Sequence, residues 1–366
     1  MNIVMIGPFP NPITGQSIAN RSVRNEFARL GLSVYAVNTN SSKINDISSQ
    51  GRLALSTLMK AVLQQLRTIA YLFKTPNCKV YITPGQSLLG FLRYAPSILV
   101  AHYCKHKVTL HFHGAYFGQM YLKSNQYLQL LIRYILERTS RIIVLGPSLK
   151  WMFKQSDKIE EKVVCCVNGI PSQLLLSKDG LTKKQSKHDS SFIKLVYISN
   201  LIESKGILDL LDAMQILLNK GWQVSLDICG SLDQAIHDRF QKKFKPLKSY
   251  CTYHGVLDGP EKAVIFEKNE VFCLPTYYPV EGQPISILEA YGQGCAVVTT
   301  DHGGIKDIFV EGKNGVFCKP RDPNSVAEAI VACHEKYFEY SKNNHSTACL
   351  KFKEESFLSR VKAIAL

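Results

Sequence analysis

Residues 270–299 read EVFCLPTYYPVEGQPISILEAYGQGCAVVT. The apolar runs Glu270–Leu274 and Cys295–Thr299 have the length and composition of buried strands. A helical segment is expected between them, because Pro284 suits the first turn of a helix and apolar residues follow it. A strand, a helix and a second strand in this order predict a parallel sheet with a helical crossover.

The same alternation of short apolar runs and helix-period stretches continues through both halves of the chain. In the first half the expected strands are Asn2–Ile6, Ser33–Asn38, Lys79–Thr83, Val108–His113, Arg141–Leu145 and Val163–Val167. In the second half they are Lys194–Ile198, Val224–Cys229, Cys251–His254, Glu270–Leu274, Cys295–Thr299 and Gly315–Cys318. The pattern predicts two doubly wound α/β domains with a cleft between them. Ligands of such folds bind beyond the carboxyl ends of the strands.

The chain has 366 residues, which suits two domains, and 46% apolar against 20% charged residues excludes a disordered or fibrous protein. The polar stretch Ser177–Ser191 lacks an apolar period and suggests a linker or exposed loop. We therefore expect a first domain over 1–180, a linker over 181–192 and a second domain over 193–345. Residues 346–366 should end in an amphipathic helix with Phe357, Val361 and Ile364 on one side.

Positive charge is concentrated in the first half of the chain. Residues 1–190 hold 24 Lys/Arg against 8 Asp/Glu, a net +16, whereas residues 191–366 hold 20 against 21, a net −1. Residues 47–136 contain ten Lys/Arg and no carboxylate. A basic half beside a neutral half indicates one anionic partner: nucleic acid, an anionic membrane or a polyphosphate-bearing substrate.

The eleven cysteines include no CxxC pair, and several lie in strand-like runs, which favours buried free thiols in a reducing compartment. Met1–Ile6 runs into a strand without a charged leader. The most apolar window, Leu88–Tyr103, contains Arg93 and Pro96 and is too short to span a bilayer. The expectation is a cytoplasmic protein that lies on a membrane without crossing it.

Two loops of the first half are candidate ligand sites. Gly15 opens the first helix after a Pro-rich loop, where backbone N–H groups can approach a phosphate or simply form a turn. His111 and His113 lie on the same side of a strand end. These histidines suit a structural role, a substrate contact or, least well, a metal, because no Asp or Glu lies within 20 residues.

In the second half, Lys205 follows the first strand at a helix entry, where an ammonium can neutralise a diphosphate. Glu281 and Glu289 form an E-x7-E pattern, with Glu281 in the loop before the helix and Glu289 about one and a half turns inside it. Taken alone, this pair also fits a helix cap and a surface carboxylate.

Several motifs in order along the chain resemble those of retaining glycosyltransferase family 4. The matching segments are the Gly15 loop, His113-Gly114, Val167–Ile170, Ser199–Gly206, Cys229-Gly230, Tyr253–Gly255, Glu281–Glu289, Gly303-Gly304 and Asp322-Pro323. The resemblance implies the GT-B fold, in which two Rossmann-like domains face each other across a cleft. It further implies that the C-terminal helix crosses back to the first domain. The first domain would bind the acceptor and the second a nucleotide-sugar donor.

The resemblance also implies roles for individual residues. Lys205 would pair with the donor diphosphate, Glu289 with the ribose hydroxyls and Glu281 with a hydroxyl of the transferred sugar. His113 would lie near the anomeric centre. Further donor contacts would come from Gly15, Gln16, Gly230, Gly282, Gln283, Pro284 and Ile285. Such enzymes usually need no metal and no cofactor, because a lysine and helix N–H groups stabilise the departing diphosphate.

One position departs from the family pattern. Asn200 stands where these enzymes usually have an arginine, so a second cation for the diphosphate is missing there. Asn can donate a hydrogen bond without supplying charge, which is expected to cost on the order of 1.5–3 kcal/mol of donor binding.

Two basic, aromatic helices of the first half suit the surface of an anionic membrane. Their basic residues are Lys60, Arg67, Lys74, Lys123 and Arg133. The acceptor would then be a lipid-linked oligosaccharide of surface polysaccharide biosynthesis, such as O-antigen or capsule, at the inner face of the cytoplasmic membrane. A solvated basic surface without a partner is the alternative.

The expected donor is UDP-linked, with GDP-mannose as the runner-up, and the sugar a hexose or N-acetylhexosamine. Two other classes are kept as alternatives. One is a nucleotide-sugar epimerase on the same fold. The other is a nucleic-acid-binding protein that uses the basic half, which is disfavoured because no reader motif is present.

Overall fold

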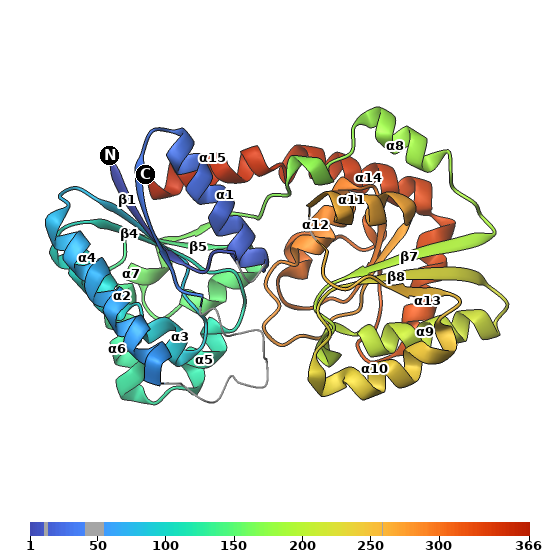
Figure 1. Ribbon diagram of the computed structural model, residues 1–366, viewed down its shortest axis with the longest axis horizontal. Coiled ribbons are helices and arrows are strands. Elements are labelled where there is room, and N and C mark those ends of the chain that lie inside the picture. Colours follow the sequence, from blue (N-terminus) through green and yellow to red (C-terminus); the bar gives the residue numbers. More distant parts are fainter. Residues whose placement is uncertain (11–13, 41–54, 258) are drawn as a thin grey trace. The chain divides into compact units, whose positions relative to one another are not determined.

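The computed structural model describes residues 1–10, 14–40, 55–257 and 259–366, with no side chains described for residues 55–61. The chain divides into two compact units, Met1–Asn168 with Glu355–Leu366, and Gly169–Glu354 (Figure 1). Each unit contains a six-stranded parallel sheet. The predicted pair of doubly wound α/β domains is confirmed.

The first unit has the strand order β2-β1-β3-β4-β5-β6. Its strands are β1 (Asn2–Gly7), β2 (Ser33–Asn38), β3 (Lys79–Ile82), β4 (Lys107–His111), β5 (Arg141–Val144) and β6 (Val163–Cys165). Its helices are α1 (Gly15–Arg29), α2 (Leu55–Lys74), α3 (Leu88–Leu92), α4 (Ala95–Tyr103), α5 (Phe117–Lys123), α6 (Gln126–Leu136), α7 (Asp157–Glu160) and the C-terminal α15 (Glu354–Ala365).

Alternate residues of β1 face two different hydrophobic clusters, as expected of a strand covered on both sides. Val4 and Ile6 pack with α2, α4 and α6 on one face of the sheet. Ile3 and Met5 pack with α1 and α15 on the other. Phe357 and Val361 of α15 are fully buried in this second cluster, so the C-terminal helix does return to the first unit.

The second unit has the strand order β12-β11-β10-β7-β8-β9. Its strands are β7 (Phe192–Ile198), β8 (Gln223–Cys229), β9 (Cys251–Tyr253), β10 (Val271–Leu274), β11 (Ala296–Thr299) and β12 (Gly315–Phe317). Its helices are α8 (Lys178–Gln185), α9 (Ile207–Asn219), α10 (His237–Phe244), α11 (Gly259–Lys268), α12 (Ile285–Gly292), α13 (Pro323–Glu335) and α14 (Tyr337–Lys351). Here α9 packs on α13, and α12 packs on α14.

The strand order of this unit reverses between β7 and β10, which are hydrogen-bonded neighbours with Val271 opposite Leu195. Such a reversal is the topological switch point, where loops leaving adjacent strands turn to opposite faces and leave a crevice. The loops that follow β7 and β10 are therefore the positions at which a ligand site is expected.

The structure differs from the expected linker over 181–192. Residues 178–185 form α8, whose N-cap Ser177 accepts a hydrogen bond from Gly180 N, and Leu181 and Lys184 are buried in the second unit. The Lys184 ammonium donates to the carbonyls of Phe266 and Gln293, at 2.8 and 2.7 Å. The two units meet along the chain at Asn168 and Gly169 rather than at residue 180. Residues 346–351 belong to α14 in the second unit.

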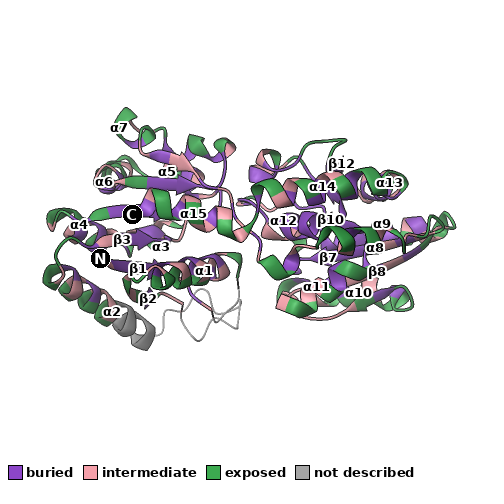
Figure 2. Ribbon diagram, turned by 90° about the horizontal axis from the view of Figure 1, so that it is seen from above, coloured by how far each residue is buried: buried purple, intermediate pink, exposed green. Residues whose placement is uncertain are grey.

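Helices α2, α5 and α6 carry large exposed apolar side chains and exposed basic ones. Figure 2 colours these helices by how far each residue is buried. The exposed apolar residues are Leu63, Leu66, Phe73, Leu122, Tyr127, Leu130, Leu131 and Tyr134. The exposed basic residues are Arg67, Lys74, Lys123 and Arg133, whereas the side chain of Lys60 lies outside the described residues. In the part of the chain that the structure describes, no helix has both the length and the apolar character to span a bilayer.

Candidate functional site

A lysine and a glutamate form an ion pair beyond the carboxyl ends of β7 and β10. Lys205 Nζ lies 2.5 Å from Glu281 Oε2, and Thr276 Oγ1 donates to the same oxygen at 3.0 Å. The side chains of Lys205 and Glu281 are only 13% and 7% exposed. Lys205 Nζ also lies 4.8 Å from the centroid of the Tyr278 ring, where a cation is attracted by the aromatic face. Lys205 and Glu281 thus form an ion pair that is shielded from water at the switch point.

A glycine fixes the turn that carries Lys205. Gly206 has φ 77°, and a Cβ at this position would lie 2.2 Å from the carbonyl oxygen of Pro275. Only glycine tolerates both conditions without strain. Tyr277 N donates to Ser204 O at 2.8 Å, which ties the turn after β7 to the loop after β10. The ion pair is therefore positioned by backbone contacts on both sides.

The backbone of Glu281 is held by the loop that follows β11. Gly304 N donates to Glu281 O at 3.3 Å, and His302 Nε2 lies 2.7 Å from Tyr278 O. Gly303 has φ 57°, and a Cβ there would lie 2.3 Å from Glu281 O. This explains why a Gly-Gly pair follows the second strand of the stretch 270–299.

Helix α12 begins beside Glu281. Pro284 is the N-cap residue, one position earlier than the first-turn position predicted for it, and its side chain offers no capping hydrogen bond. The N–H groups of the first turn therefore point out of the helix next to the Gly282-Gln283 segment, and the helix dipole favours negative charge there. Gly282 and Gln283 are buried.

Glu289 lies inside α12 with a side chain that is 4% exposed. Its partner is Lys262 of α11, whose Nζ lies 2.7 Å from Oε1 and 2.6 Å from Oε2. Sequence reasoning missed Lys262, because no motif or spacing links α11 to α12. Both carboxylates of the E-x7-E pattern are thus neutralised by lysines, Glu281 by Lys205 and Glu289 by Lys262.

Gly230 and Asn200 flank the same end of the sheet. Gly230, after β8, has φ 141°, and a Cβ there would lie 1.8 Å from Ser199 O. Asn200, after β7, is exposed, while its carbonyl accepts from the Tyr197 hydroxyl at 3.1 Å. The Asn200 side chain is therefore free to be replaced by a longer one without disturbing the core.

The other predicted donor contacts, Gly15, Gln16 and His113, belong to the first unit. Thr14 caps α1 by accepting from Ser17 N at 3.1 Å, and Ser17 Oγ accepts from Thr14 N in return. Gln16 Nε2 donates to Thr83 O at 3.3 Å, across the switch point between β1 and β3. Gly15 and Gln16 form the first turn of α1, which is suited to an anion.

His111 and His113, at the end of β4, lie ring to ring, as their spacing predicts, with centroids 4.1 Å apart. His111 Nδ1 lies 2.5 Å from the Tyr81 hydroxyl, while His113 Nε2 is buried without a hydrogen-bond partner among the described residues. Burial lowers the pKa of His113 to about 4 and, together with the His113 charge, holds the pKa of His111 well below its usual value. His113 is thus a neutral imidazole at pH 7, with one nitrogen available to a ligand.

The depressed pKa of His113 predicts acid sensitivity. An unfolded histidine titrates near 6.5, so between pH 6.5 and about 4 the unfolded chain binds the extra proton and the folded chain does not. The contribution is fully present above pH 6.5, and its loss on acidification should reach roughly 2–3 kcal/mol near pH 4. Denaturant unfolding of wild type and His113→Gln at several pH values tests this. The variant should lose less stability on acidification. An equal loss of the free energy of unfolding in both proteins would contradict the lowered pKa of His113.

Two parallel-sheet Rossmann-like units are the architecture of the GT-B fold of glycosyltransferases. Over the whole chain, the fold is similar to that of Anabaena Alr3699/HepE in complex with UDP, with a TM-score of 0.74, 14% identity and 99% of both chains covered. Residues 193–336 match the family model for glycosyl transferases group 1. The second unit is therefore similar to that family over these residues, in line with the resemblance of its motifs.

Curated relatives match part of the chain. Glycogen synthase of Mycobacterium tuberculosis is 28% identical over 144 residues, covering 37% of this chain and 33% of that protein. The capsular polysaccharide biosynthesis glycosyltransferase CapM of Staphylococcus aureus is 25% identical over 195 residues, covering 52% of this chain and 50% of CapM. The matches thus span between a third and a half of the length of these relatives.

Proposed function

We propose that this protein is a retaining glycosyltransferase that moves a hexose or N-acetylhexosamine from a nucleotide-sugar, UDP-linked rather than GDP-linked, to a lipid-linked oligosaccharide. The expected setting is the assembly of a surface polysaccharide. The similarity to CapM and to the group 1 family model supports sugar transfer and polysaccharide synthesis. The UDP bound to the Anabaena protein supports the choice of nucleotide.

The observation that carries the proposal is the Lys205–Glu281 pair at the switch point of the second unit. The diphosphate of an incoming donor would take Lys205 as its counter-ion. Glu281 would then be freed to accept a hydrogen bond from a hydroxyl of the transferred sugar, while Thr276 continues to hold its carboxylate. Each partner of the pair thus has a defined role when the donor binds.

Leaving-group stabilisation requires positive charge where the nucleoside diphosphate departs. Lys205 and the uncapped N–H groups of α12 supply it from this chain, so the proposal includes transfer without a divalent metal. Glu289 would bind the ribose hydroxyls in exchange for one of its contacts with Lys262. The neutral His113 would offer its unpartnered nitrogen to the sugar.

Thermal-shift measurements with UDP, GDP and ADP, each with and without Mg²⁺, test the donor site. UDP is expected to raise the Tm with its concentration, and equally in both conditions, since a ligand that binds only the folded state stabilises it by mass action. A shift with GDP alone would overturn the choice of uridine. Turnover of the nucleotide-sugar without any acceptor would favour an epimerase.

Asn200→Arg is expected to bind UDP about 10-fold more tightly than wild type, since a second cation adds a charge-assisted contact of about 1.5 kcal/mol. The exposed position of Asn200 allows the longer side chain. The control Asn200→Gln keeps the amide and adds length without charge, so its Kd should stay within about twofold of wild type. Calorimetric titration measures all three, and equal affinities would remove Asn200 from the diphosphate site.

The lipid-linked acceptor is proposed from the first unit. Exposed apolar and aromatic side chains stand beside Arg67 and Lys74 on α2 and beside Lys123 and Arg133 on α5 and α6. Contiguous exposed apolar surface beside basic charge is typical of proteins that lie on anionic membranes. This supports a peripheral position on the cytoplasmic face of the membrane, where lipid-linked acceptors are presented.

Replacing Arg67, Lys74, Lys123 and Arg133 together by Gln should weaken binding to vesicles that contain anionic lipid by about 10²-fold or more, at about 1 kcal/mol for each basic residue. Vesicle sedimentation at low and high salt measures it. A matched variant replaces the second-unit residues Lys242, Lys245, Lys313 and Lys336, and its binding should be unchanged. Tight binding to oligonucleotides instead of vesicles would favour the nucleic-acid alternative.

A further inference from the structure

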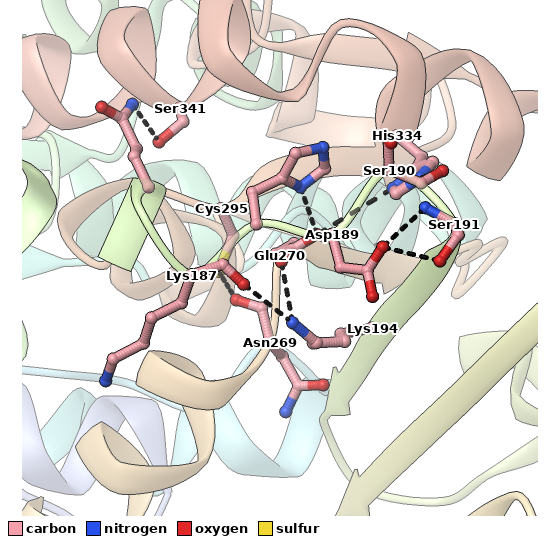
Figure 3. Close-up of polar contacts among 12 residues, drawn as sticks. Lys187, Asp189, Ser190, Ser191, Lys194, Asn269, Glu270, Cys295, His334 and Ser341 are labelled. Atoms are coloured by element: carbon pink, nitrogen blue, oxygen red, sulfur yellow. Dashed lines mark hydrogen bonds and ion pairs between the residues drawn. The ribbon is translucent and has the colours of Figure 1, made fainter. Parts of the chain in front are cut away.

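Two histidines and a glutamate of the second unit meet at the amino end of β10, the opposite end of that strand from the Lys205–Glu281 pair. His188 lies between α8 and β7, Glu270 immediately precedes β10, and His334 lies in the last turn of α13. Figure 3 shows Glu270 among its polar neighbours, which include Lys194 and His334. This cluster has no part in the proposed donor site.

The donor atoms of the three side chains are close together and shielded from water. His188 Nδ1 lies 2.8 Å and His334 Nδ1 lies 3.9 Å from the same oxygen, Glu270 Oε2. One ligand atom from each of the three residues lies within 4.8 Å of the others. The side chains of His188, Glu270 and His334 are 9%, 3% and 4% exposed. Two imidazoles and a carboxylate therefore share one nearly dry space.

His334 has an unsatisfied nitrogen that faces this space. Its Nε2 lies 3.1 Å from the carbonyl oxygen of Ser190, which only accepts hydrogen bonds, so Nε2 carries the proton. In the neutral ring, Nδ1 then presents a lone pair, and it has no hydrogen-bond partner among the described residues. A lone pair 3.9 Å from a carboxylate oxygen places two acceptors opposite each other. A cation between them removes the conflict.

We propose that His188, Glu270 and His334 bind a divalent transition metal of the zinc class. Two histidines and one carboxylate form a donor set that zinc accepts, with bonds of about 2.0–2.2 Å. In a tetrahedral site such bonds place the donors about 3.3–3.5 Å apart. The observed separations, from 2.8 Å to at most 4.8 Å, bracket that value, so the three donors already lie close to the spacing of such a site.

The surroundings supply the outer contacts that metal ligands usually have. Ser190 O holds the protonated nitrogen of His334, and Lys194 Nζ lies 3.3 Å from Glu270 Oε1, the oxygen that the metal would not use. Glu270 and Lys194 also line a cavity of about 520 Å³, which gives an ion a route to the carboxylate. A bound metal would connect the segment before β7, the amino end of the central strand β10 and α13, and so stabilise the second unit.

The test uses the full-length protein after treatment with a chelator. Calorimetric titration with Zn²⁺ should give one site per chain with a Kd of about 1 µM or tighter, and the metal should raise the Tm. Titration with Co²⁺ should give the visible absorption of a low-symmetry site with nitrogen and oxygen ligands. His334→Gln and His188→Gln should each weaken Zn²⁺ binding by about 100-fold or more, since even outer contacts of a metal are worth 10- to 100-fold.

The matched control is His237→Gln, because His237 Nδ1 also lies beside a carboxylate, 3.1 Å from Asp238, but on the surface and without a third donor in the part of the chain that the structure describes. Its Zn²⁺ affinity should equal that of wild type. Should the buried substitutions prevent folding, Glu270→Gln supplies a third variant with nearly the same shape. The proposal is overturned by wild type without a stoichiometric site, or by undiminished binding in the folded variants. It is equally overturned by near-ultraviolet thiolate absorption with Co²⁺, which would place the metal on cysteines.

Discussion

Glu281→Gln is expected to lower the kcat of sugar transfer by about 10²–10³-fold, the usual effect of removing one group that contacts developing charge in a water-excluded site. The variant keeps the shape of the side chain but loses the ionised oxygen that accepts from Thr276 and faces Lys205. Initial rates with a saturating nucleotide-sugar and an acceptor lipid measure it.

The control for Glu281→Gln is Glu203→Gln. Glu203 lies in the same turn as Lys205, but its side chain is 52% exposed and its partner is the surface residue Arg239. Such pairs contribute little, so kcat should change by less than about twofold. A decrease of only a few-fold in Glu281→Gln would exclude Glu281 from contact with the reacting sugar.

Lys205→Met should raise the Kd for UDP by about 10- to 100-fold, because the diphosphate loses a charge-assisted contact of about 1.5–3 kcal/mol. Binding of uridine, which has no phosphate, should be unchanged. Comparison of the two ligands by calorimetry separates a diphosphate contact from a general loss of structure. A parallel loss of UDP and uridine affinity would contradict the assigned role.

The variant Lys243→Met is the matched control for Lys205→Met. Lys243 is also paired with a carboxylate, that of Asp212, but both side chains are more than a third exposed and lie away from β7 and β10. Its affinity for UDP should equal that of wild type. The Tm of Lys205→Met should in addition be lower than that of the control, because Glu281 is left buried without its counter-ion.

The twelve strands were predictable because parallel strands covered on both faces read as short apolar runs. Every predicted strand lies within two residues of the observed one, as Val108–His113 does against β4 (Lys107–His111). The amphipathic C-terminal helix was equally predictable, because its buried side chains recur with the period of a helix. Lys205 and Glu281 were candidates from their local sequence, and the family resemblance implied their roles. The structure adds that the two side chains form a pair.

Contacts between segments distant in the sequence were not predictable. The expected linker was wrong because a lysine such as Lys184 is normally expected to be exposed to solvent. Its ammonium is instead buried against two carbonyl groups. The pairing of Lys262 with Glu289 joins residues 27 positions apart on different helices. His188, Glu270 and His334 come together through the packing of α8, β10 and α13, and no local sequence pattern predicts that packing.

The return of α15 to the first unit affects the order of events during synthesis. Phe357 and Val361 complete a hydrophobic cluster. Most of its other members, such as Ile3 and Phe27, precede residue 169. The ribosome must translate all of Gly169–Glu354 before those two side chains exist. At 5–20 residues per second this takes on the order of 10–40 s. The first unit is thus completed only after the second has been translated, and during that interval the sheet face lacks the part of its cover that α15 supplies.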